Sequence, residues 1–162
     1  MWFKGILTAM FLVNITCQAQ DLRQLILEKY KGYKSSFSKV SEVMVTEIKK
    51  LSTSEVVFVD VRSEAERNVS IIPGAIDQAE FEKNLERFRS RKIIVYCTIG
   101  FRSGVYTQKL NKKGVAAHNL VGGVLMWAYY KNKFVRGGEP TNKVHVYGKE
   151  WNLLPQEYIA IW

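Results

Sequence analysis

Short apolar runs alternate with longer amphipathic segments along this chain. Runs rich in β-branched and aromatic residues, bounded by turn residues, predict strands, whereas apolar residues three or four positions apart predict helices. The predicted strands are Val40–Val45, Glu55–Val61, Ile71–Ile76, Ile93–Tyr96 and Val115–Val121. The third of these is expected to be broken by the Pro73-Gly74 turn. The predicted helices are Asp21–Lys31, a short helix that ends at Leu51, Asp77–Arg89, the segment from Ser103 to Gly114, and Val124–Tyr130. This alternation predicts a single α/β domain, with a central parallel sheet and helices on both faces.

The predicted strand Ile93–Tyr96 leads directly into Cys97 and a short loop. Gly100 allows this loop to turn tightly, Ser103 is the predicted N-cap of the next helix, and Gly114 is its predicted stop. Cys97 is therefore expected to lie in front of a helix N-terminus. The unpaired backbone N–H groups and the positive end of the helix dipole favour an anion at that place.

These surroundings are typical of a reactive thiolate. The guanidinium of Arg102 adds a positive charge close to Cys97 along the chain, and the thiolate is the nucleophilic form of cysteine. Cys97 and Asp60 both fall at the carboxyl ends of predicted strands, where the active sites of parallel α/β sheets lie. The alternative is a buried cysteine that acts as a small hydrophobic residue. The neighbouring Gly100 and Arg102 argue against that alternative.

The first residues have the pattern of a secretory signal peptide. Lys4 precedes an apolar run, and Cys17 and Ala19 occupy the −3 and −1 positions of a cleavage site after Ala19. The run is shorter than the roughly 20 apolar residues that span a bilayer. Residues 1–19 are therefore predicted to be removed, and the mature protein to be periplasmic or extracellular. An uncleaved anchor or a lipoprotein anchored through Cys17 is the alternative, although Asn14–Thr16 do not match the usual sequence before a lipidated cysteine.

Charge and cysteine content narrow the classes of function. Cleavage would leave Cys97 as the one cysteine of the mature chain, so no internal disulfide is expected. The formal net charge of +9 would fall by one with Lys4, and a basic surface suits small anions. Nucleic-acid binding is not expected, because the basic residues are scattered rather than interleaved with aromatic residues. His118 and His145 are expected to be structural, with a catalytic role as the alternative. One cysteine and two separated histidines lack the spacing of metal ligands, and no metal or cofactor is expected.

Four segments, taken in their order and spacing, resemble the rhodanese-like (sulfurtransferase) domain family. They are Val59–Arg62, Ile72–Ala75, Cys97–Ser103 and Leu120–Trp127. One departure is Ser70-Ile71, at a place where the family usually has Gly-His with a structural histidine. The expected divisions are a signal peptide at 1–19, an N-terminal helical extension at 20–39, the rhodanese-like domain at 40–135 and a C-terminal extension at 136–162.

The resemblance implies that Cys97 is the catalytic residue and passes through a persulfide. A donor such as thiosulfate would supply the sulfane sulfur, and a thiol or cyanide would accept it. The implied substrate-binding cradle is Thr98, Ile99, Gly100, Phe101, Arg102 and Ser103. Its N–H groups would hold the terminal sulfur, and Arg102 would bind the sulfonate of the donor. Ile99 and Phe101 would either line an apolar entrance for the acceptor or pack against the last helix.

Asp60 and Arg62 resemble the Asp-x-Arg of the family, where the arginine typically forms a structural ion pair. Support of the cysteine loop by Asp60 is the alternative. Ser63, with Glu64 and Glu66, predicts a capped turn directly after this segment.

Loop length separates two kinds of chemistry. Four residues stand between Cys97 and Arg102, whereas the related dual-specificity phosphatases have five, which makes a wider cradle for phosphate. The shorter loop favours sulfur transfer and argues against a phosphatase or an arsenate reductase. A persulfide carrier that serves a specific protein acceptor remains a second hypothesis.

Overall fold

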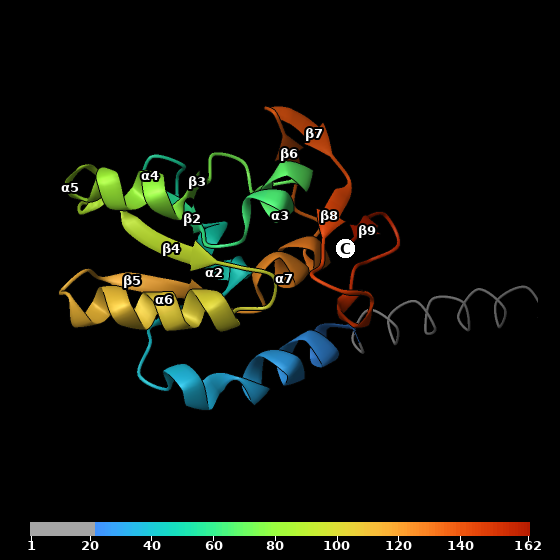
Figure 1. Ribbon diagram of the computed structural model, residues 1–162, viewed down its shortest axis with the longest axis horizontal. Helices are drawn as coiled ribbons and strands as arrows, with labels where there is room; N and C mark the ends of the chain where they lie inside the picture. The colour runs from blue at the N-terminus through green and yellow to red at the C-terminus, as the bar shows by residue number, and fades with distance from the viewer. Residues whose placement is uncertain (1–21) are drawn as a thin grey trace, which may run out of the picture.

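Five parallel strands form the central sheet of the computed structural model, which describes residues 22–162 (Figure 1). The strands are β1 (Glu42–Val43), β2 (Val56–Asp60), β3 (Ile76–Asp77), β4 (Lys92–Tyr96) and β5 (Ala117–Leu120). Their order across the sheet is β1-β5-β4-β2-β3. The two longest strands are neighbours at the centre, where Val59 lies opposite Val95 and Asp60 opposite Tyr96. The predicted signal segment, residues 1–19 with Cys17, lies outside the described residues.

Helices cover both faces of this sheet, which confirms the predicted α/β architecture. They are α2 (Val45–Ile48), α3 (Glu64–Val69), α4 (Gln78–Lys83), α5 (Leu85–Phe88), α6 (Phe101–Lys112) and α7 (Gly123–Tyr129). A helix over residues 22–32 and the 3-10 turn η1 (Lys34–Phe37) precede β1. None of the helices within residues 22–162 is long and apolar enough to cross a membrane.

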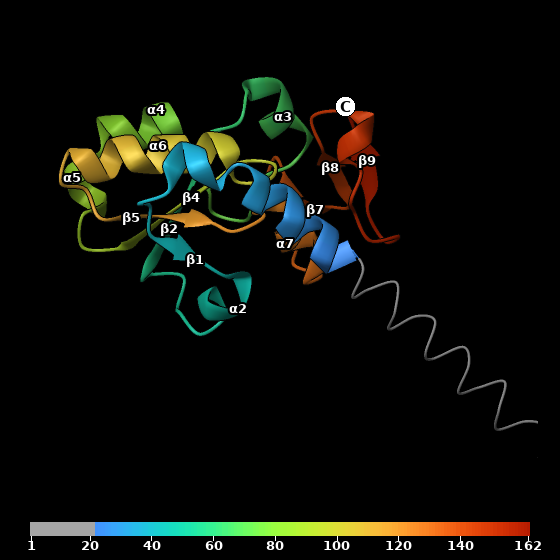
Figure 2. The ribbon, with the colours of Figure 1, turned by 90° about the horizontal axis from the view of Figure 1, so that it is seen from below.

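The alternation of side chains along β2 and β4 explains the two layers of helices. Val57 and Val59 of β2 belong to one buried cluster with residues of α4, α5 and α6, whereas Val56 of β2 belongs to another with residues of α2 and α7. Successive side chains of a strand point to opposite faces, so a strand that is apolar throughout must be covered on both. Figure 2 shows α4 and α6 on one face of the sheet and α2 on the other.

The chain beyond α7 folds back toward the carboxyl ends of the central strands (Figure 1). The antiparallel hairpin β6 (Phe134–Arg136) and β7 (Glu139–Thr141) is followed by β8 (Lys143–His145), the 3-10 turn η2 (Lys149–Trp151) and β9 (Ile159–Ile161), which pairs in parallel with β8. Phe134, Val144 and Val146 are almost fully buried and belong to the same cluster as α7. This segment is therefore an integral part of the domain core.

Helix α6 begins at Phe101, two residues before the predicted start, so the prediction of Ser103 as its N-cap was wrong. Gly100 is the N-cap, with φ 110°, a left-handed conformation that glycine adopts without the strain of a Cβ atom. The hydroxyl of Ser103 is occupied elsewhere, because it donates to the sulfur of Cys97. The predicted stop at Gly114 is confirmed, since α6 ends at Lys112 and Gly114 has φ 75°.

Two further predictions need correction. Of the predicted strand Ile71–Ile76, only the last residue belongs to the central sheet, in β3. Ile71 instead forms a bridge to Val135 of the β6–β7 hairpin. The predicted break at Pro73-Gly74 is present as a turn, and its glycine has φ 75°. The predicted helix Asp77–Arg89 is divided at Asn84 into α4 and α5.

Candidate active site

Cys97 directly follows β4 and lines a cavity of about 400 Å³. It is a free cysteine with only 1% of its surface exposed, so its sulfur lies at the inner wall of that cavity. The loop after Cys97 contributes Thr98, Ile99, Phe101 and Arg102 to the lining, and residues from both ends of the described chain, Tyr33, Tyr147 and Trp151, contribute the remainder.

Two donors of the loop are directed at the Cys97 sulfur. The backbone N–H of Gly100 donates to Sγ at 3.2 Å, and the hydroxyl of Ser103 donates to it at 3.5 Å. Both come from the turn where the loop enters α6, so they combine hydrogen-bond donation with the positive end of the helix dipole. This arrangement favours negative charge on the sulfur. Ser103, predicted as a member of the cradle, thus reaches Sγ through its side chain.

Gly100 is held in place from the neighbouring strand β5. The side-chain amide of Asn119, fully buried at the end of β5, donates to the carbonyl of Gly100 at 2.9 Å and to the hydroxyl of Tyr30 at 3.1 Å. Tyr30 in turn donates to the carboxylate of Glu42 in β1. Burial, together with this contact to Glu42, raises the pKa of Tyr30 well above its usual range, so Tyr30 stays a neutral donor. The loop is therefore connected to β5, to β1 and to the N-terminal helix.

Arg102 lines the cavity, and its guanidinium is paired with the carboxylate of Glu66 in α3. Both contacts of the pair, Nη1 to Oε2 and Nη2 to Oε1, measure 2.7 Å, and Nη2 also donates to the hydroxyl of Thr98 at 3.2 Å. The hydrogen bond to Glu66 raises the pKa of Arg102, and the nearby Cys97 contributes in the same direction. The guanidinium is therefore fixed beside the cysteine loop and partly neutralised.

The role of Glu66 was missed in the sequence interpretation, which placed it only in a capped turn. Its carboxylate accepts hydrogen bonds from the backbone N–H and the hydroxyl of Ser63, which completes a capping box at the start of α3. Burial opposes ionisation of Glu66, but the hydrogen bonds from Arg102 and Ser63 outweigh it and lower its pKa to about 2. The spacing of Ser63 and Glu66 signals the capping box, whereas nothing local signals the partner 36 residues away.

Asp60 and Arg62 form a buried ion pair at the end of β2. The contacts are 2.9 Å from Nε to Oδ1 and 2.7 Å from Nη2 to Oδ2. Arg62 also donates to the carbonyl of Ser70 at 2.7 Å. Burial lowers the pKa of Arg62, but its contact with Asp60 outweighs this and leaves that pKa raised. These contacts fasten the segment after α3 to the end of β2 and do not reach the Cys97 loop, so the geometry corresponds to the expected structural pair.

Ile99 and Phe101 have different surroundings, although both line the cavity. Ile99 is 4% exposed and belongs to the buried cluster that contains α7. Phe101 is 39% exposed, and its ring lies 5.1 Å from that of Tyr33. Ile99 thus packs in the cluster that contains α7, whereas Phe101 lies at the cavity entrance.

The model of the rhodanese-like domain family matches residues 44–129, more than half of the 162 residues. The chain therefore belongs to the rhodanese-like domain family, as the resemblance implied. The matched segment contains most of the parallel sheet and the loop between β4 and α6 that begins at Cys97.

A tRNA uridine(34) hydroxylase of Ruegeria pomeroyi is 31% identical over 87 residues, which are 48% of this chain and 29% of that protein. The chain thus spans less than a third of the length of this curated relative.

Solved structures share the fold. A thiosulfate sulfurtransferase from Pseudomonas aeruginosa matches with a TM-score of 0.57 and 21% identity, over 70% of this chain and 24% of that one. A rhodanese-related protein from Thermoplasma volcanium matches with a TM-score of 0.51 and 20% identity, over 59% of this chain and 97% of that one.

Proposed function

We propose that this protein is a sulfurtransferase in which Cys97 carries sulfane sulfur as a persulfide. The observation that carries the proposal is the position of Cys97, at the end of β4 and at the inner wall of a cavity, with its sulfur accepting hydrogen bonds from Gly100 and Ser103. A thiosulfate-like anion is the proposed donor. A thiol or cyanide is the proposed acceptor.

The reaction has two displacement steps. In the first, the thiolate of Cys97 attacks the sulfane sulfur of thiosulfate, a bond forms between the two sulfur atoms, and sulfite leaves with the electron pair of the broken bond. In the second, the acceptor attacks the outer sulfur of the persulfide, and the Cys97 thiolate leaves. The Gly100 N–H and the Ser103 hydroxyl stabilise negative charge on sulfur in both steps.

We assign Arg102 the role of attracting and orienting the sulfonate of the donor. Its guanidinium is fixed by Glu66 in a defined orientation, and about one third of its side chain remains exposed to the cavity and solvent. A fixed guanidinium loses little side-chain entropy when it binds an anion. The pairing with Glu66 also weakens its net charge, so the attraction is moderate.

Intact-mass spectrometry of the purified protein before and after thiosulfate tests the proposal. We expect an increment of one sulfur atom, about 32 Da, that is removed by added thiol and absent from Cys97→Ser. Circular dichroism of Cys97→Ser checks that the variant is folded. No increment in folded wild-type protein contradicts the proposal.

Steady-state turnover of thiosulfate with cyanide then separates an enzyme from a persulfide carrier, since a carrier forms the persulfide but turns over slowly. Hydrolysis of an aryl phosphate, lost in Cys97→Ser, would instead support the phosphatase that loop length argues against.

We also propose that the protein is exported. The support is the sequence pattern of residues 1–19, with Lys4 before an apolar run and Ala19 at the cleavage position. N-terminal sequencing of protein from the periplasm or the medium should begin at Gln20. A chain that begins at Met1, or a lipid on Cys17, contradicts this proposal.

A further inference from the structure

Aromatic rings follow one another around the entrance of the Cys97 cavity. Phe101 lies 5.1 Å from Tyr33 between ring centroids, Tyr33 stacks on Trp151 at 6.2 Å, and Trp151 meets Tyr147 edge-on at 6.5 Å. The guanidinium of Arg102, the residue after Phe101, lies 5.5 Å from the ring of Tyr147. The contacts therefore form a continuous series from Phe101 to Arg102. We call Tyr33, Phe101, Tyr147 and Trp151 the aromatic rim.

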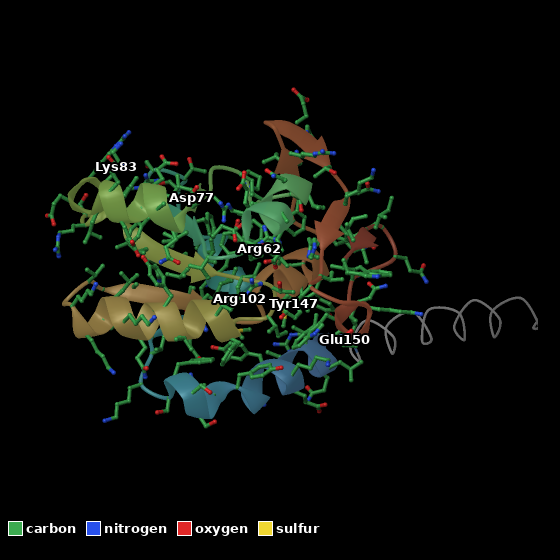
Figure 3. All side chains as sticks on the ribbon, viewed as in Figure 1. Arg62, Asp77, Lys83, Arg102, Tyr147 and Glu150 are labelled. Carbon is green, nitrogen blue, oxygen red and sulfur yellow. The ribbon has the colours of Figure 1, made fainter. Side chains whose placement is uncertain are left out.

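Three of the four rim residues lie outside the segment that matches the family model. Tyr33 precedes residues 44–129, and Tyr147 and Trp151 follow them. Figure 3 shows Tyr147 of the C-terminal segment beside Arg102 at the start of α6, and the contact of their side chains brings these distant parts of the chain together. The rim is thus built by the two extensions of this chain around the cysteine loop of the shared domain.

Tyr147 and Trp151 of the rim are held in place by neighbouring residues. Val144 and Val146 are fully buried, which fixes the backbone that leads to Tyr147. Tyr147 itself has φ 74°, a conformation that costs a residue with a side chain about 1 kcal/mol or more, and its N–H donates to Nδ1 of His145 at 3.1 Å. The ammonium of Lys29 lies 4.7 Å from the ring of Trp151. The ring of Tyr147, with 63% of the residue exposed, is thereby presented at the entrance in an otherwise unfavourable backbone conformation.

The cavity offers a sequence of chemical environments from its inner wall outward. The Cys97 sulfur comes first, the Arg102 guanidinium lies beside it, and the aromatic rim lies beyond. Thiosulfate, with five heavy atoms, interacts with the first two and leaves the apolar rings in water. A volume of about 400 Å³ is in the range of pockets that bind organic molecules, in which apolar and aromatic walls surround a few polar groups.

We propose that the aromatic rim selects a sulfur donor whose transferable sulfur is bonded to a sulfonyl group that carries a flat apolar group, in preference to inorganic thiosulfate. An aryl thiosulfonate has the required order: a sulfane sulfur for Cys97, sulfonyl oxygens for Arg102 and an aromatic ring for Tyr33, Tyr147 and Trp151. This inference rests on the proposed function, since it names the donor class for the same Cys97 chemistry.

The transfer from such a donor is balanced without a further reagent. The Cys97 thiolate attacks the sulfane sulfur of the aryl thiosulfonate, and a new S–S bond forms. The bond between the sulfane sulfur and the sulfonyl sulfur breaks, and the aryl sulfinate leaves with its electron pair. The persulfide of Cys97 is the same product that thiosulfate would give.

The experiment compares benzenethiosulfonate, methanethiosulfonate and thiosulfate as donors. The first two have the same reacting atoms and charge and differ in the group on the sulfonyl sulfur, so the change in their ratio of kcat/KM between wild type and rim variants measures the contribution of the rim. In wild-type protein we expect benzenethiosulfonate to exceed methanethiosulfonate by roughly tenfold to hundredfold, which is the usual discrimination of an apolar pocket. Release of sulfinate or sulfite and the mass of the persulfide are the readouts.

Trp151→Ala and Tyr147→Leu should each reduce this ratio at least threefold. Trp162→Ala is the matched control, because Trp162 belongs to the same C-terminal segment, is 59% exposed and does not line the cavity, so its ratio should equal that of wild type. Tyr147→Leu retains an apolar side chain and removes the ring with its hydroxyl, so it remains informative if Trp151→Ala fails to fold.

The outcomes separate this inference from the function on which it rests. Absence of a persulfide with all three donors contradicts the proposed function itself. Persulfide formation with a ratio near one, or a high ratio that neither Trp151→Ala nor Tyr147→Leu reduces, overturns the role of the rim and leaves sulfur transfer by Cys97 intact.

Discussion

Arg102 and Glu66 form a two-pronged ion pair, with 2.7 Å at each contact, between the first turn of α6 and the first turn of α3. The same carboxylate caps α3 through Ser63, and the same guanidinium donates to Thr98 in the cysteine loop. Glu66 therefore couples the folding of α3 to the geometry of the loop. Because Glu66 is paired with Arg102, the guanidinium beside Cys97 is not a free positive charge.

Glu66 should make the stability of the protein depend on pH in the acid range. Its pKa of about 2 in the folded protein is below the ordinary value of 4.5, so its contribution to stability is complete above about pH 4.5 and is lost as the pH falls toward 2. Between pH 7 and pH 3 we expect wild type to lose about 2 kcal/mol of unfolding free energy that Glu66→Gln does not lose. Urea unfolding of both proteins across this range measures the difference. Parallel pH profiles would contradict the assignment.

The pairing also predicts opposite effects of its two members on an anionic donor. Arg102→Ala should raise the apparent KM for thiosulfate more than it alters an uncharged donor, because it removes the guanidinium proposed to bind the sulfonate. Glu66→Gln should lower the KM for thiosulfate severalfold, because the guanidinium then retains its full charge. Steady-state kinetics of both variants, compared with Glu64→Gln on the exposed side of the same helix, test this. Equal shifts for charged and uncharged donors in Arg102→Ala would argue against anion binding.

Gly100 is predicted to be essential for both the shape and the packing of the loop. It has φ 110°, and a Cβ atom there would lie 2.5 Å from the ring of Tyr30. Gly100→Ala should therefore cost about 3 kcal/mol and slow persulfide formation. Gly114→Ala is the control, because Gly114 also has a positive φ, 75°, but has open space around it, and it should cost only about 1 kcal/mol. Thermal unfolding of both variants gives the comparison, and similar costs would show that the Tyr30 contact is unimportant.

Asn119 should act as a positioning residue for the Gly100 N–H that contacts sulfur. Asn119→Leu removes the hydrogen bond to the Gly100 carbonyl, and we expect a cost of about 1–2 kcal/mol and a severalfold slower formation of the persulfide. Tyr30→Phe removes only the phenol hydroxyl and leaves the bond between Asn119 and Gly100, so it should preserve the rate within about twofold. Stopped-flow kinetics with thiosulfate distinguish the two variants. A normal rate in folded Asn119→Leu would contradict the positioning role.

Most of the central fold could be predicted from local patterns. The apolar runs of β2 and β4, which are buried on both faces, predicted a parallel sheet, and Cys97 was correctly placed at the carboxyl end of a strand, before a helix. These features are local, because burial, periodicity and turn residues are written in consecutive positions. The start of α6 was misplaced because a serine at a predicted N-cap looks the same in sequence whether its hydroxyl binds the helix backbone or, as here, the sulfur of Cys97.

The sequence by itself determined the class of fold, the family and the cysteine on which the proposed chemistry depends. Only the tertiary structure decided which partners that cysteine loop has. Glu66 lies 36 residues from its partner Arg102. Asn119 and Tyr30, which both contact Gly100, lie 19 and 70 residues from it, and no local pattern connects these residues. The aromatic rim is of the same kind, since Tyr33 and Trp151 are brought together only when the two extensions pack against one domain. Contacts between distant segments form only when the whole chain folds and buries its apolar residues. A single sequence shows each residue of such a contact but not which residue it pairs with.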